Sequence, residues 1–124
     1  MTAATVAVWI GVALIGGAGS VCRFLVDRTV GRRMARSFPF GTMTVNVTGA
    51  ALLGFLGGLA LSKDAALLCG TAFVGAYTTF STWMLEAQRL AEERQLRSAA
   101  VNVAVSVVLG LAAALLGQLI AERL

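Results

Sequence analysis

Four long apolar stretches constrain the fold of this chain more than any other feature. They cover about residues 5–26, 42–61, 65–85 and 98–120, and most charged residues lie between them. Crossing about 30 Å of hydrocarbon takes about 20 residues of helix, and lipid cannot satisfy the polar groups of an irregular backbone. With 58% hydrophobic and 13% charged residues, the chain is too apolar for an ordinary soluble domain. We therefore predict an all-α membrane protein with four transmembrane helices in a single domain, residues 1–124.

Charge and cysteine content narrow the classes of function. The net charge of +4 comes from arginines at the ends of the apolar stretches, where anionic headgroups lie, so we expect a lipid bilayer and no nucleic acid as partner. Cys22 and Cys69 lie inside apolar stretches without a CxxC pair or any histidine, which favours inert packing. The first stretch has no basic region before it and runs on to Arg23, so we interpret it as a span and not a cleaved signal peptide.

The distribution of arginines predicts an orientation. With four spans, loops 27–41 and 86–97 share one side, and the termini share the other with the remaining loop. Seven arginines lie on the first side and two basic residues on the second: Arg28, Arg32, Arg33, Arg36, Arg89, Arg94 and Arg97 against Lys63 and Arg123. The positive-inside rule then places both arginine loops in the cytoplasm. We also expect loop 27–41 to form a short amphipathic segment at the interface, and Pro39 to mark the start of the second helix.

Small residues recur four apart, a spacing that brings helix backbones close together in lipid. They fall in three of the spans: Gly16 and Ser20; Ala50, Gly54 and Gly58; and Gly110, Ala114 and Gln118. Four short helices enclose little volume, so we expect the chain to oligomerise.

The third stretch contains an unusual polar run, residues 75–83, with five hydroxyl groups and one glycine. Gly75, Thr78 and Thr79 can interrupt the helix and free carbonyl oxygens, which are hard ligands for a cation. Phe80 and Trp83 share a helix face, and their ring edges together with hydroxyl donors suit a small anion. Packing aromatics and hydroxyls that bond between helices remain an equal alternative.

Polar residues in the other spans allow similar alternatives. Asn46 can donate two hydrogen bonds to an anion or serve as a helix-packing amide. Asn102 and Ser106 are four apart and form a short polar track, or they hold helices together. Arg23 either snorkels to the interface or attracts anions. Glu86 either pairs with an arginine or faces a pore mouth.

These features resemble the CrcB/Fluc family of fluoride channels over essentially the whole chain. The resemblance is carried by length, four spans, Gly-Thr-x-x-x-Asn at residues 41–46, Thr-Thr-Phe-Ser-Thr at residues 78–82, and Arg23. It implies an antiparallel, dual-topology dimer with two fluoride pores in a bacterial plasma (inner) membrane. It also implies a structural sodium ion at the dimer centre, held by the backbone carbonyls of Gly75 and Thr78.

The resemblance implies which residues form the fluoride path. They are Asn46, Phe80, Trp83, Thr79, Ser81, Thr82, Asn102, Ser106, Arg23 and Glu86. Three positions depart from the family pattern, because Trp83 replaces a second phenylalanine, Asn102 stands where tyrosine is frequent, and Gly110 lacks a hydroxyl. The implied mechanism is passive: hydroxyl and amide donors replace the water around fluoride, and no substrate is transformed, so we expect no enzyme activity.

Three alternatives stay open. The arginine bias allows insertion in one direction and pairing with an oppositely biased paralogue, which would make the chain half of a heterodimeric fluoride channel. A small multidrug-resistance-type cation exporter also has four spans, but proton exchange needs a membrane-embedded acid, which residues 5–26 lack. The chain could also be a scaffold subunit held by small-residue packing. In that case the polar residues 78–82 would serve only as contacts between helices.

Overall fold

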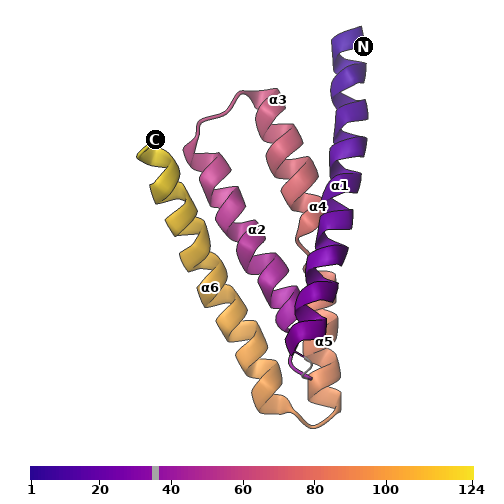
Figure 1. Cartoon of the computed structure of the whole chain (residues 1–124), viewed down its shortest axis with the longest axis vertical. Helices are drawn as coiled ribbons and strands as arrows, with labels where there is room; N and C mark the ends of the chain where they lie inside the picture. Colours follow the sequence, from indigo (N-terminus) through magenta and orange to yellow (C-terminus); the bar gives the residue numbers. More distant parts are fainter. Residues whose placement is uncertain (35–36) are drawn as a thin grey trace.

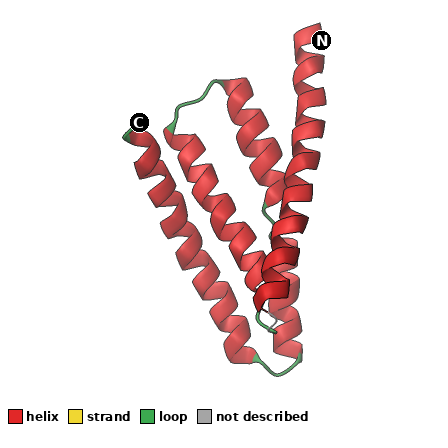
Figure 2. Cartoon of the chain, viewed as in Figure 1, coloured by secondary structure: helices red, strands yellow, loops and turns green. Residues whose placement is uncertain are grey.

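A computed structural model describes residues 1–34 and 37–124, and all regular structure in these residues is helical (Figure 2). The elements in chain order are α1 (Ala3–Met34), α2 (Phe40–Gly58), α3 (Lys63–Ala66), the π-helical segment η1 (Leu67–Val74), α4 (Gly75–Tyr77), α5 (Ser81–Glu92) and α6 (Leu96–Glu122). The chain is thus an all-α membrane protein. Among the residues that the structure describes, three helices, α1, α2 and α6, are long and apolar enough to cross a bilayer.

The helices run alternately up and down the bundle (Figure 1). Both termini and the α2–α3 loop lie at one end, and the α1–α2 and α5–α6 connections lie at the other. The two arginine-bearing loops therefore share one end of the molecule, as the sequence predicts. The third pass, from α3 to α5, is the one divided into short pieces, and its first part, from α3 to α4, lies between α1 and α2.

Helix α1 is longer than the sequence predicts. It continues through Asp27 and Arg28 to Met34, so the predicted interfacial segment beginning at residue 27 is wrong up to that point. Charged residues leave the apolar environment without ending the helix, because arginine is a good helix former. Arg36, which we also assigned to this loop, lies outside the described residues. The predicted helix start at Pro39 is confirmed, since Pro39 occupies the N-cap position of α2.

The most extensive helix interface joins α2 to α6, and small residues determine how closely they approach. A Cβ on Gly54 would lie 2.7 Å from the carbonyl carbon of Ala114, and one on Gly117 would lie 2.9 Å from the amide nitrogen of Phe55. The expected small-residue contact is confirmed for Gly54 and Ala114. It is wrong for Gly110, beside which a Cβ would meet open space. On α6, the small residues that contact α2 include Ala114 and Gly117, because they lie on the face of the helix that meets α2.

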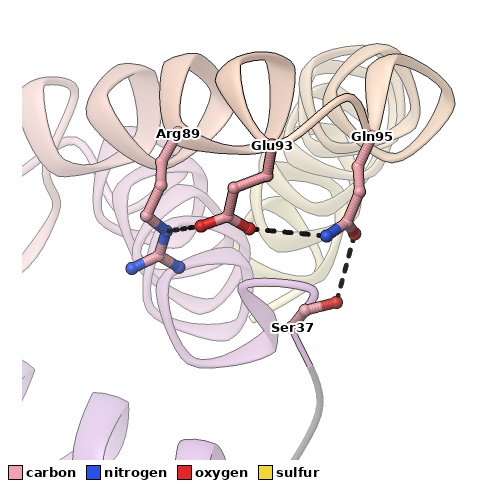
Figure 3. Close-up of polar contacts among 4 residues, drawn as sticks. All are labelled: Ser37, Arg89, Glu93 and Gln95. Carbon is pink, nitrogen blue, oxygen red and sulfur yellow. Dashed lines mark hydrogen bonds and ion pairs between the residues drawn. The ribbon is translucent and has the colours of Figure 1, made fainter.

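Surface polar contacts join the two arginine-bearing connections (Figure 3). The Ser37 hydroxyl donates to Gln95 Oε1 at 3.3 Å, and Gln95 Nε2 donates to Glu93 at 3.4 Å. Glu93 also pairs with Arg89 at 4.0 Å on α5. Such exposed contacts contribute about 0–1 kcal/mol each, so they orient these connections more than they stabilise the fold.

Candidate functional site

The third pass is interrupted at residues 78–80, between α4 and α5. Thr78 has extended geometry (φ −86°, ψ 160°), which ends the helix there. Helix α5 begins after it, with the Thr82 N–H donating to the Thr79 hydroxyl oxygen at 3.2 Å. The predicted break at Thr78 and Thr79 is confirmed. Gly75 as a point of interruption is wrong, because its backbone is helical (φ −59°, ψ −38°) and a glycine weakens a helix without ending it.

Asn46 on α2 holds the broken segment. Its Oδ1 accepts from the Thr79 N–H at 2.8 Å, and its Nδ2 donates to the Thr79 carbonyl at 2.8 Å. Gly49, one turn further along α2, allows this approach: a Cβ there would collide with the Thr78 methyl group and lie 3.3 Å from the Tyr77 ring. The second Nδ2–H makes no bond within the described chain and remains available to a ligand.

The break withdraws the usual donors from two carbonyl groups. In a continuous helix the Thr79 N–H would bond to the Gly75 carbonyl, but it donates to Asn46 instead. Likewise, the Thr82 N–H donates to the Thr79 side chain in place of the Thr78 carbonyl. The described residues contain no cluster of three or more carboxylate or thiol groups that could hold a metal. Neutral carbonyl oxygens of this kind fit a hard cation such as sodium.

An open cavity of about 310 Å³ lies beside the break. It is lined by Asn46, Gly49, Ala50, Leu53, Val74, Thr78, Thr79, Phe80, Trp83 and Ser106. The Thr78 hydroxyl donates to the Val74 carbonyl at 2.9 Å and is therefore occupied. In the described part of the chain the Thr79 hydroxyl hydrogen has no protein acceptor, so it and the remaining N–H of Asn46 can donate into the cavity.

The two aromatic residues at the cavity contact each other edge to face. The rings of Phe80 and Trp83 are 5.8 Å apart at 84°, which confirms the shared face predicted from their spacing. The Trp83 indole N–H donates to the backbone carbonyl of Asn102 on α6 at 3.4 Å. That donor is thus directed at α6, and the ring edges remain the groups that an anion in the cavity can contact. Phe80 is 71% exposed, so its ring projects away from the chain's own core.

A second cavity, of about 250 Å³, adjoins the first. Its lining is more polar: Ser20, Arg23, Phe24, Asp27, Thr42, Val45, Thr79 and Thr82. Thr79 lines both cavities, so the two lie next to each other. Arg23 gives the second cavity a positive charge, and Asp27 places a carboxylate in the same cavity.

The predicted polar residues of α6 differ in position. Ser106 lines the main cavity and donates to Asn102 Oδ1 at 3.4 Å. Asn102 is fully buried, and its Nδ2 has no partner among the described residues. Near the end of the third pass, Glu86 accepts a hydrogen bond from the Thr42 hydroxyl, and it lines a separate cavity beside Arg89. Ser81 is exposed at the first turn of α5.

Four further residues at these cavities escaped the sequence reasoning: Ser20, Asp27, Thr42 and Gly49. Gly49 lies three residues after Asn46 and Thr42 four before it, so helical spacing from Asn46 would have indicated both. Asp27 was assigned to a loop because the predicted first span ended at Val26, eight residues before the end of α1 at Met34.

Comparison with known proteins shows the family of this chain. The family model described as CrcB-like protein, Camphor Resistance (CrcB), matches residues 10–118. The chain belongs to the CrcB family. The resemblance stated from the sequence is therefore confirmed.

Several curated relatives of this CrcB-family chain cover nearly its whole length. A fluoride-specific ion channel FluC 2 from Mycobacterium tuberculosis is 78% identical, over 98% of this chain and 96% of the relative. A second FluC 2, from Mycolicibacterium paratuberculosis, is 74% identical, over 95% and 97%. A fluoride-specific ion channel FluC 1 from Symbiobacterium thermophilum is 43% identical, over 88% and 93%.

Proposed function

We propose that this chain forms a fluoride-specific ion channel through which fluoride leaves the bacterial cytoplasm passively. Membership of the CrcB family and the names of its relatives support this function. The structural observation that carries it is the cavity at residues 78–80, where unoccupied hydroxyl and amide donors face aromatic ring edges. Transport of fluoride makes and breaks no covalent bond, so the protein acts as a channel and not as an enzyme.

The path runs through the two adjoining cavities. Arg23 in the second cavity attracts the anion, and the Thr82 and Thr79 side chains pass it toward the main cavity. There the Thr79 hydroxyl and the free Asn46 N–H take the place of water, and the edges of Phe80 and Trp83 contact the anion. Ser106 lines the same cavity, with its hydroxyl donating to Asn102. Distributed weak contacts let the ion leave as readily as it enters. Ser81, Glu86 and Asn102 are proposed for the path from the family resemblance alone, since none of them lines either of these two cavities.

The proposed active form is an antiparallel dimer in which each chain crosses the membrane four times. The exposure of Phe80 and the open side of the main cavity support the presence of a second copy, because one chain alone does not enclose the path. Gly75 is exposed, and no atom lies within 4 Å of the position that a Cβ would occupy there, so a partner backbone has room to approach. Carbonyls of Gly75 and Thr78 from both copies would then hold a structural sodium ion between the subunits.

The partner and the membrane orientation follow from charge. We propose a homodimer in the bacterial inner membrane, with dual topology despite seven arginines in one pair of loops and two basic residues on the opposite side. A heterodimer remains the second candidate, because relatives numbered FluC 1 and FluC 2 exist and this arginine bias favours one direction of insertion.

The function is tested by fluoride efflux from liposomes that contain only this purified chain. We expect rapid fluoride efflux, no chloride efflux, and loss of fluoride efflux in Phe80→Ile, which removes the aromatic edge while remaining apolar. Phe73→Ile is the matched control, because Phe73 is seven residues earlier in the same pass, stacks on Tyr77 and lines neither of the two cavities.

Each outcome decides between hypotheses. Efflux of wild type that disappears only in Phe80→Ile supports a self-sufficient homodimeric channel. A folded wild-type protein without fluoride efflux contradicts the homodimer, and recovery of efflux on adding a paralogue would establish the heterodimer. Equal efflux from both phenylalanine variants would show that the break does not form the path.

A further inference from the structure

We propose that Asn46 is a positioning residue that fixes the break in the third pass by holding the Thr79 backbone outside the helix. Its effect on ion flux rests on the proposed function, but its effect on the backbone does not. The sequence left its amide with two possible uses, anion donor or packing group. In the structure, the amide oxygen and one of its two N–H groups are bonded to one backbone residue 33 positions away.

The geometry is that of a single rung of β-ladder. In a β-pair, one residue exchanges an N–H and a carbonyl bond with its partner. Here the side-chain amide of Asn46 supplies both complementary groups to Thr79, each at 2.8 Å. Thr78 before it is extended, with ψ at 160°. These two bonds replace the helical bonds that Thr79 gives up, so neither of its backbone groups is left unsatisfied.

This bond pair fixes the groups that follow it. Since Thr79 is held at its backbone, its hydroxyl oxygen accepts from the Thr82 N–H and starts α5 at a fixed place. Phe80 then projects outward at 71% exposure, with its ring against Trp83. Removing the Asn46 amide leaves the Thr79 N–H and carbonyl without these two bonds and frees residues 78–80 to move, which changes the position of Phe80. Asn46 therefore shapes the cavity through Thr79 in addition to lining it.

Amide hydrogen exchange at Thr79 tests the proposal directly. In wild-type protein in detergent micelles, read by NMR, we expect slow exchange at Thr79 compared with Phe80, because in the described chain the Phe80 N–H has no acceptor. In Asn46→Leu, which has similar volume and no polar atoms, exchange at Thr79 should rise about tenfold. Asn46→Asp keeps the acceptor oxygen and should keep the protection.

A second readout follows Trp83 directly. In a Trp9→Phe background Trp83 is the single tryptophan, and Trp9 lies on an exposed part of α1. Asn46→Leu should shift the Trp83 emission maximum at unchanged elution volume. Thr48→Val is the matched control: it removes another α2 side-chain bond to the third pass, the 2.9 Å contact with the Tyr77 hydroxyl, and should leave both readouts unchanged.

The possible results separate this proposal from the proposed function. Wild-type exchange as fast at Thr79 as at Phe80 would overturn the positioning role even if no variant folds. Equal protection in Asn46→Leu and wild type would overturn it too, as would complete loss of protection in Asn46→Asp. Absence of fluoride efflux from wild type, with the exchange pattern as expected, would reject the channel and leave the backbone role of Asn46 intact.

Discussion

Replacing Gly54 by alanine should force α2 and α6 apart. A Cβ at this position would lie 2.7 Å from the carbonyl carbon of Ala114 and 2.8 Å from its Cα, and closer still to the carbonyl oxygen. Ordinary contacts of this kind fall between 3.4 and 4 Å. The obstructing atoms belong to backbone, so no side chain can rotate away and the helices must separate by about 1 Å locally.

The cost follows from what this separation removes. A gap of about 0.5–1 Å forfeits a quarter to a half of the dispersion energy of each facing atom pair. In lipid that energy, and not hydrophobic burial, holds helices together. Overpacking of a tight interface costs about 1–3 kcal/mol, which corresponds to a fall in Tm on the order of 10 °C for a chain of this size.

Gly57→Ala provides a control three residues away on the same helix. No atom lies within 4 Å of a Cβ placed at Gly57, so alanine there should be neutral or should stabilise by up to about 1 kcal/mol through its higher helix propensity. The assay is thermal unfolding of both variants in detergent, followed by loss of the folded elution peak. A Tm for Gly54→Ala equal to that of wild type, or an equal fall in both variants, would refute the backbone-contact argument.

Two further predictions concern backbone strain and the aromatic pair. Ala60 has a φ of 52°, where a Cβ costs about 1–2 kcal/mol, so Ala60→Gly should raise the Tm by a few degrees in the same assay; a lower Tm would contradict the strain. Trp83→Phe removes the N–H that donates to the Asn102 carbonyl and reduces the ring beside Phe80, so fluoride efflux should become severalfold faster. An unchanged rate would place Trp83 outside the conduction path.

Much of the fold was predictable because membrane helices are governed by local composition. The ends of α2 and α6 fall within a few residues of the predicted stretches, and Pro39 marks the start of α2. The end of α1 was not predictable from apolarity, since charge ends a membrane span without ending a helix. Asp27 therefore lies on a helix and lines a cavity with Arg23, although the sequence interpretation placed it in a loop.

The candidate site was predictable in its location but not in its bonding. Residues 78–82 were predicted as the site because hydroxyl groups are unsuited to a lipid-facing helix, and the cavity lies at these residues. The sequence did not show that Ser106 faces this cavity while Asn102, one turn earlier, is fully buried with an unpaired amide nitrogen. Both residues lie on the same side of α6, and only its packing against α2 and α5 separates their environments.

By itself, the sequence determined that the chain is helical, that it lies in a membrane, and that its third pass breaks near Thr78, because these properties depend on neighbouring residues and on lipid as solvent. Only the tertiary structure decided that the chain remains helical through Gly75 and leaves the helix after Tyr77. A helix continues until its backbone groups find other partners, and here the partner is Asn46, 33 residues away. No local sequence pattern encodes this contact between Asn46 and Thr79, since it forms only once α2 lies beside the third pass.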